Sequence, residues 1–287
     1  MDVHVYEDTT CKLGEGAFWH PLRGQFFWFD ILGRKLFTRK GDELSVWQFS
    51  RHVSAAGWLD RNTLMIADEI SLFAFNVETG DRVHLTHLEA DNKITRSNDG
   101  RADPWGGFWI GTMGKNAEAG AGAIYRYYRG QLQQLYSPIT ISNAICFSPC
   151  RLYAYFTDTV TKKVMRQKLE PLNGWPEGDA EILIDLTADG LNPDGAVVDV
   201  DGNLWIAQWG ASRVASYSSE GVFIKAIDMP ASQITCPAFG GQNLNRLFVT
   251  SADIGLSQEQ LKSEPKAGQT FFVENVAKGQ REFQVIL

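Results

Sequence analysis

The chain has 287 residues, of which 44% are hydrophobic and 12% aromatic, so it is long enough to bury a large core. Its net charge of −7 argues against nucleic acid and anionic membrane surfaces as partners, because both require a basic surface. No apolar run reaches the roughly 18 residues of a membrane-spanning helix.

The N-terminal stretch "MDVHVYEDTT" has neither a basic segment nor an apolar one, so we expect no signal peptide. The four cysteines, Cys11, Cys146, Cys150 and Cys236, are few for this length and predict free thiols that fill the core. We therefore expect a cytoplasmic protein that is a monomer or a weak homodimer.

Six short runs rich in aromatic and β-branched residues predict antiparallel strands, because Gly, Asp, Asn or Pro bounds each of them. In chain order they are "GQFFWFD" (24–30), "RNTLMIAD" (61–68), "GGFWIGT" (106–112), "CRLYAYFTD" (150–158), "GNLWIAQW" (202–209) and "NRLFVTSA" (245–252). Their centres, which we place at Trp28, Met65, Trp109, Tyr155, Trp205 and Phe248, are 37 to 50 residues apart.

A repeat of this length, with about four short strands per unit, is typical of a β-propeller. Six units account for the whole chain, so we predict one all-β domain, a six-bladed β-propeller over residues 1–287. A β-sandwich with accidental spacing is the alternative. The segments "VHVYE" (3–7) and "TFFVE" (270–274) alternate in a way that suits closure of the ring, and "GLSQEQLKSEP" (255–265) predicts one short helix.

Each aromatic strand is preceded by a shorter segment that ends in a turn. In the third unit the turn is Asp103-Pro104, so "SNDG" (97–100) belongs to the strand before it and is not a hairpin tip. If the blades are built from the axis outward, the starts of these inner strands line one mouth of the channel. Polar residues stand there 11 to 13 positions before each aromatic centre: Glu15, Ser54, Asn98, Asn143, Asp194 and Thr235.

A ring that holds two carboxylates and two amides suits a hard divalent cation, because calcium and magnesium prefer oxygen ligands. Without a cation the carboxylates would repel each other at the channel mouth. The alternative for Asn98 and Asp194 is an ordinary Asx turn, since each lies near a glycine. His52 lies close to the same position in its repeat unit. It is either an ordinary surface residue or a substrate contact.

Several stretches keep the order of a known family along essentially the whole chain. They include "LGEGAFW", "WFDILGRKLF", "RSNDGRADPWGGFWIGTM", "ISNAICFSP" and "NPDGAVVDVDGNLWIAQWG". On these motifs the chain resembles the SMP-30/gluconolactonase family, which includes regucalcin and bacterial sugar lactonases. The resemblance implies a six-bladed propeller with a central metal-binding channel.

The resemblance also implies roles for individual residues. It makes Glu15, Asn143 and Asp194 the metal ligands and assigns substrate contacts to Arg96 and Asn98, with Asp99 and Glu118 as further pocket members. The chain departs from the family pattern at Ala144, where Gly is usual, and at Cys150, where Asp is common. It also departs at "WGASRV" (209–214). These departures leave the ligand set intact and put the fit of the substrate in question.

The function implied is hydrolysis of a sugar lactone, an aldono- or aldarolactone, to the open acid. The metal would act as a Lewis acid, and Asp194 would serve as ligand and general base. We expect one divalent ion, with Ca²⁺ first and Zn²⁺, Mg²⁺ or Mn²⁺ as alternatives. Two other functions remain open: a calcium-binding regulatory protein without turnover, and an esterase or organophosphate hydrolase that uses the same site.

Overall fold

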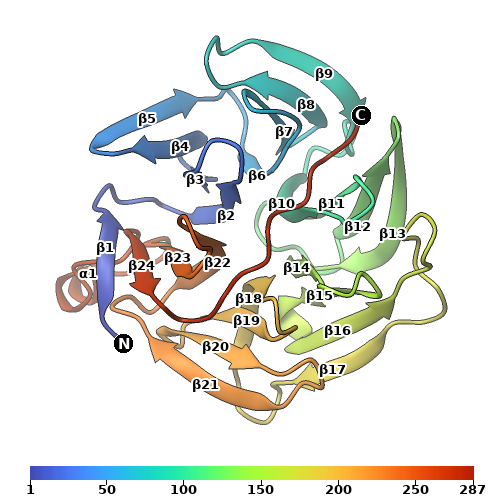
Figure 1. Cartoon of the computed structure of the whole chain (residues 1–287). Coiled ribbons are helices and arrows are strands. Elements are labelled where there is room, and N and C mark those ends of the chain that lie inside the picture. Colours follow the sequence, from blue (N-terminus) through green and yellow to red (C-terminus); the bar gives the residue numbers. More distant parts are fainter.

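In the computed structural model, which describes all 287 residues, six four-stranded antiparallel sheets are arranged around one axis (Figure 1). Five of the sheets use four consecutive strands, ordered from the axis outward. Blade 1 holds β2 (Gly14–His20), β3 (Gln25–Asp30), β4 (Lys35–Lys40) and β5 (Glu43–Gln48). Blade 2 holds β6 (Val53–Trp58), β7 (Thr63–Asp68), β8 (Ser71–Asn76) and β9 (Arg82–His87).

The next three blades repeat this order. Blade 3 holds β10 (Thr95–Ala102), β11 (Phe108–Gly114), β12 (Gly122–Tyr128) and β13 (Gln131–Ile139). Blade 4 holds β14 (Ser142–Phe147), β15 (Tyr153–Asp158), β16 (Lys163–Lys168) and β17 (Glu181–Asp185), with the 3-10 turn η1 (Thr159–Thr161) after β15. Blade 5 holds β18 (Asn192–Val198), β19 (Leu204–Trp209), β20 (Arg213–Tyr217) and β21 (Phe223–Asp228).

Blade 6 closes the ring with a strand from the other terminus, as the sequence predicts. Its order is β22 (Ile234–Gly240), β23 (Arg246–Ser251), β24 (Thr270–Glu274) and then β1 (Val3–Glu7). The helix α1 (Gln258–Ser263) lies within the predicted segment and begins with a capping box in which Ser257 accepts a hydrogen bond from the Gln260 amide. It is too short to cross a membrane, and no other helix of the chain could do so.

The six predicted aromatic runs are the second strands of the blades, and they form the core. Trp28, Trp109 and Trp205 are fully buried between neighbouring sheets. The segment "SNDG" lies inside β10, and the turn after it is fixed by Asp103. The Asp103 carboxylate accepts hydrogen bonds from the Trp105 and Gly107 amides at 2.8 and 2.9 Å and pairs with buried Arg126 at 2.7 Å.

The prediction that the cysteines are free core fillers holds for three of the four. All four thiols are free, and Cys11, Cys146 and Cys236 are buried. Cys150 is exposed, so the prediction that it fills the core is wrong. It lies in the turn between β14 and β15, where the chain passes over the surface.

The two mouths of the channel differ. We call the end at which the inner strands begin the entrance mouth. The other end is crossed by the C-terminal tail, residues 275–287, and we call it the tail mouth (Figure 1, red). The tail is tied to the blades by backbone hydrogen bonds, among them Val285 N to Trp58 O at 3.0 Å and Ile286 N to Gly106 O at 2.8 Å.

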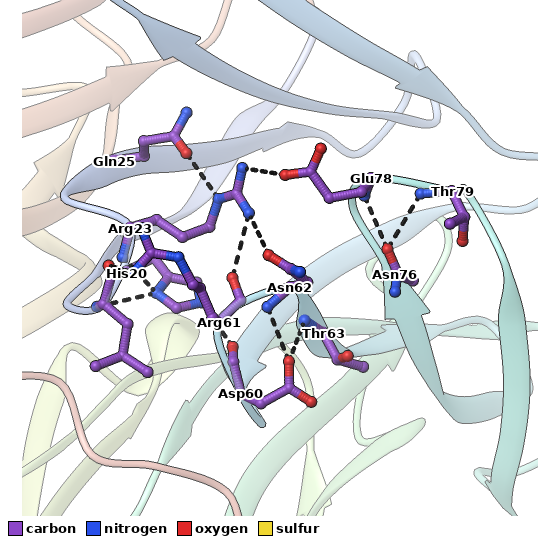
Figure 2. A network of polar contacts seen from close by, with 11 residues as sticks. His20, Arg23, Gln25, Asp60, Arg61, Asn62, Thr63, Asn76, Glu78 and Thr79 are labelled. Carbon is purple, nitrogen blue, oxygen red and sulfur yellow. Dashed lines mark hydrogen bonds and ion pairs between the residues drawn. The ribbon is translucent and has the colours of Figure 1, made fainter.

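On the tail side a polar network joins blades 1 and 2 (Figure 2). Arg23, in the turn after β2, pairs with Glu78 at 2.7 Å and donates to Asn62 Oδ1 at 2.9 Å. Buried His20 places Nε2 3.0 Å from the Asp60 carbonyl oxygen. The hairpin turns of blades 1 and 2 therefore contribute polar contacts at this end.

Candidate functional site

All six inner strands carry a register irregularity near their starts. In β2 the pair Glu15–Phe29 is followed by Phe18–Phe27, so three steps on the inner strand match two on its partner. The strands β10, β14, β18 and β22 show the same count, and β6 also gains one residue. An extra residue of this kind is a β-bulge, which bends the strand and redirects its side chains. The bulges therefore lie where the sequence predicts the polar ring.

Two of these bulges require a left-handed backbone. Gly16 in β2 has a φ of 58°, and Ala144 in β14 has a φ of 55°. A Cβ atom on Gly16 would lie 2.1 Å from the Ser54 carbonyl oxygen, so only glycine fits at that position. Ala144, the residue that replaces the family's usual glycine, adopts the same conformation at an energetic cost.

The entrance mouth leads into a cavity of about 570 Å³. Its buried end is formed by four members of the predicted ring and the predicted arginine: Glu15, Asn98, Asn143, Asp194 and Arg96. Apolar and polar side chains line the rest of the cavity. The apolar lining residues include Leu13, Leu32, Trp209 and Ile254, and the polar ones include Lys115 and Asn116. The structure thus brings all three predicted metal ligands to one cavity.

The amide side chains at the closed end hold one another in place. Asn98 donates from Nδ2 to Ser142 O at 2.8 Å and to Asn143 Oδ1 at 3.1 Å. Asn143 donates from Nδ2 to Thr159 Oγ1 at 2.9 Å. Since an amide oxygen has two lone pairs, Asn143 Oδ1 keeps one that can bind a cation.

The two carboxylates at the closed end have no ion-pair partner. The Glu15 side chain accepts a hydrogen bond from the Gly16 amide at 3.2 Å, and neither Glu15 nor Asp194 forms a salt bridge. Burial raises the pKa of Glu15, and the charge of Asp99 raises it further. Burial, then the charges of Glu15 and Asp99, raise the pKa of Asp194. The site therefore favours either protonated carboxyls or a bound cation.

The donor atoms fit a hard divalent cation. Two carboxylates and one amide oxygen are the ligand types that Ca²⁺, Mg²⁺ and Mn²⁺ prefer, and water can complete the shell. No group of three or more His, Cys, Asp and Glu side chains in the chain could hold a metal ion. A site for a metal at Glu15, Asn143 and Asp194 thus depends on the amide as its third protein ligand.

Arg96 is a buried cation beside these carboxylates. Its Nη1 donates to Asn98 Oδ1 at 2.7 Å and to Ser97 O at 2.8 Å, while its Nε has no protein partner. Burial lowers the pKa of Arg96 to about 10, against the opposing charges of Glu15, Glu69 and Asp194, so it stays charged near neutral pH. Arg96 also lines the cavity, so its guanidinium can bind an oxygen atom of a ligand.

Two predicted pocket members do not line the cavity. Asp99 is buried behind it, where its carboxylate accepts a hydrogen bond from the Ile145 amide at 2.7 Å. Burial raises the pKa of Asp99 to about 6, against the opposing charge of Arg101. Glu118 lies in the loop after β11 and accepts hydrogen bonds from the amide and side chain of Asn116, both at 3.0 Å. Asn116 therefore occupies the position in the cavity that the sequence analysis gave to Glu118.

Two members of the predicted ring are also outside the cavity. Ser54 donates to Ser97 Oγ at 2.7 Å, and Thr235 donates to Gly14 O at 2.5 Å, so both hydroxyls join neighbouring inner strands. His52 does not line the cavity either. It lies 2.8 Å from the Glu69 carboxylate, which also binds Lys115 at 2.6 Å.

Lys115, Asn116 and the apolar lining residues of the cavity were not predicted from the sequence. A signal for the first two exists, because Thr95 pairs with Gly114 in the β10–β11 ladder. In an antiparallel pair the end of the second strand lies beside the start of the first. The residues that follow Gly114 therefore reach the same mouth as Arg96.

Comparisons with known proteins agree with this architecture. A family model described as "SMP-30/Gluconolactonase/LRE-like region" matches residues 13–253. The L-arabinolactonase of Azospirillum brasilense is 33% identical over 93% of this chain and 90% of its own length. The 6-deoxy-6-sulfogluconolactonase of Pseudomonas putida is 30% identical over 90% of each chain.

Solved structures show the same fold. The crystal structure of a calcium-binding protein, regucalcin, from Agrobacterium tumefaciens superposes with a TM-score of 0.96. The two sequences are 38% identical, and the match covers 99% of this chain and 97% of the other. The six-bladed arrangement and its connectivity are therefore shared over the whole length.

Proposed function

The chain belongs to the SMP-30/gluconolactonase/LRE-like family and is a lactone-hydrolysing enzyme, and we propose that it opens a sugar lactone with the help of one divalent cation held by Glu15, Asn143 and Asp194. The observation that carries this proposal is the pair of buried carboxylates, Glu15 and Asp194, which have no ion-pair partner at the closed end of an open cavity. A cation there would neutralise them and favour their charged forms.

When bound, a divalent cation supplies Lewis-acid chemistry, which polarises a lactone carbonyl and stabilises negative charge on its oxygen. Asp194 takes the proton of the attacking water as general base. The water oxygen forms the new bond to the carbonyl carbon, the ring ester bond breaks, and the proton goes to the leaving ring oxygen. The product is the open hydroxy acid, which is an anion at neutral pH.

Other side chains orient the substrate. The Arg96 guanidinium, which lines the cavity, donates to a lactone or hydroxyl oxygen. Asn98 has both of its N–H groups in use, so we assign it mainly to holding Arg96 and Asn143 in place. Asn116 and Lys115 face the same cavity and can bind sugar hydroxyls. A site that hydrogen-bonds these hydroxyls rejects analogues that lack them.

The alternative without turnover, a calcium-binding regulatory protein, requires only the cation ligands. The cavity contains more than that, because Arg96 presents a buried donor without a partner and the site is open to small molecules. These features favour catalysis. An esterase or organophosphate hydrolase activity would use the same groups and is tested by including a simple carboxylic ester and a phosphotriester in the assay.

The test is a pH-stat assay of aldono- and aldarolactones with five and six carbons. Protein stripped by a chelator is assayed alone and after addition of Ca²⁺, Mg²⁺, Mn²⁺ or Zn²⁺. We expect hydrolysis only with a metal, and a large loss in Asp194→Asn. Asp189→Asn, an exposed acid of the same segment, is the matched control and should retain wild-type activity. Full activity after exhaustive chelation would contradict the proposal, and cation binding without hydrolysis of any lactone or ester would favour the regulatory alternative.

A further inference from the structure

The C-terminal tail sends one acidic side chain into the tail mouth of the channel. Glu282 is fixed there by its backbone, because its carbonyl oxygen accepts a hydrogen bond from Trp58 Nε1 at 3.1 Å. Its carboxylate forms an ion pair with Arg101, and both side chains are about nine-tenths buried, with exposed fractions of 11% and 8%. A buried pair of this kind is strongly destabilised when one partner is removed.

Arg101 connects three inner strands. It lies on β10 and donates from Nε to Ile145 O on β14 and from Nη2 to Ala196 O on β18, both at 3.3 Å. Its remaining Nη1 binds Glu282. The rigid fork of a guanidinium fixes the relative positions of the groups that it contacts better than a lysine could.

The three strands that Arg101 connects are those that supply the other end of the site. Asn98 lies three residues before Arg101 on β10, Asn143 two before Ile145 on β14, and Asp194 two before Ala196 on β18. On each strand only the β-bulge separates this residue from Arg101 itself or from the carbonyl group that Arg101 contacts. A change in the spacing of the strands at the fork would therefore move the donor atoms at the entrance mouth.

We propose that Glu282 is a positioning residue for the cation site: by holding Arg101, it sets the distances between the inner strands that carry Asn98, Asn143 and Asp194. This inference rests on the cation site of the proposed function. Glu282 itself touches neither cation nor substrate, since it lies at the opposite mouth. In other metal sites, residues that orient the metal ligands without touching the metal act in the same way, and their loss weakens metal binding.

The experiment compares two variants of the tail by calorimetric titration of the chelated protein with Mn²⁺ and by thermal melting. Glu282→Gln removes the charge that holds Arg101. Gln284→Ala is the control, because Gln284 also bonds a blade through the tail, at Leu59 O, without contact to Arg101. We expect E282Q to weaken Mn²⁺ binding by about tenfold or more and Q284A to leave it unchanged within about twofold. Glu282→Asp, which keeps the charge, should recover most of the affinity.

A folded E282Q protein that binds Mn²⁺ as tightly as the wild type would overturn the proposal. If E282Q does not fold, the double variant R101M/E282M decides, because an apolar pair of similar size removes the buried charges together. It should fold and still bind Mn²⁺ weakly, since the fork to β14 and β18 is gone. Wild-type affinity in that variant would overturn the proposal as well. Absence of Mn²⁺ binding in the wild type would instead overturn the proposed cation site.

Discussion

The two ends of the six inner strands lie in very different surroundings. At the entrance mouth they are bulged, and they bury the carboxylates of Glu15 and Asp194 without ion-pair partners. At the tail mouth they are paired regularly, and buried charges such as Arg101 and Asp103 have partners in Glu282 and Arg126. The entrance mouth therefore carries unfavourable electrostatics that a ligand can relieve, while the tail mouth contributes to the stability of the ring.

The largest expected effect is at the entrance mouth. Asp194→Asn removes both a proposed ligand and the general base, so kcat for lactone hydrolysis should fall by roughly 10³-fold or more. The Tm of the metal-free protein should stay equal or rise, because one of two repelling buried carboxylates is lost. Activity assays of the two metal-loaded proteins check the first statement, and melting curves of the two metal-free proteins check the second. A variant with wild-type kcat would show that Asp194 is not the base.

A substitution at the tail mouth should lower stability and leave activity unchanged. Val285 is buried in a core cluster that also contains Phe108 and Ile110, and Val285→Ala should cost roughly 2 kcal/mol of unfolding free energy through lost packing. Because the cavity lies at the other mouth and the Arg101–Glu282 ion pair is left intact, KM and kcat of the variant should match those of the wild type at a temperature where both are folded. A large loss of activity without a loss of stability would break the division between the two mouths.

The pH dependence of stability gives a sharper test of the tail side. Burial lowers the pKa of His20 to about 4 from its ordinary value of 6.5. Between these values the unfolded chain binds a proton at this residue and the folded chain does not, so stability is lost as the pH falls from 6.5 to 4. The slope from this residue is at most about 1.4 kcal/mol per pH unit.

Denaturant unfolding of the wild type and His20→Gln at several pH values measures this slope. The difference in unfolding free energy between the two proteins should change by at most about 1.4 kcal/mol for each pH unit between pH 6.5 and 4. It should stay constant above pH 7. An identical pH dependence in both proteins would show that His20 is not held neutral by its surroundings.

The smallest effect is expected at Ala144, whose left-handed conformation favours glycine. Ala144→Gly should change stability by at most about 1 kcal/mol, upward, because relief of strain exceeds the added entropy of the unfolded chain. Ala154→Gly, in the regular strand β15, is the control and should lower the Tm. Equal losses in both variants would contradict the conformational argument.

Much of the fold follows from local patterns. The aromatic runs around Trp28, Trp109 and Trp205 predict the second strand of each blade, because full burial between sheets requires large apolar residues there. The register between these strands and the inner segments then predicts that Glu15, Asn143 and Asp194 meet. The repeat predicts only that these residues belong to one ring of six polar residues, whereas the choice of these three as metal ligands comes from the family resemblance.

What could not be predicted depends on contacts between distant residues. Asn98 and Asp99 are adjacent, and only the bulge in β10 determines that Asn98 faces the cavity while Asp99 binds the Ile145 amide. Glu118 was implied by the family resemblance, although the β10–β11 register brings Asn116 to the cavity instead. The tail has no strand pattern, and its path across the channel depends on partners such as Trp58 and Arg101, more than 170 residues away.

Calcium-soaked crystals of the chelated protein test the central claim most directly, with diffraction data collected at a wavelength where calcium scatters anomalously. The account predicts one strong anomalous peak at the closed end of the cavity, within about 2.6 Å of oxygen atoms of Glu15, Asn143 and Asp194. A protein that hydrolyses lactones in calcium solution but shows no peak at these three residues, or a peak only elsewhere, would contradict it.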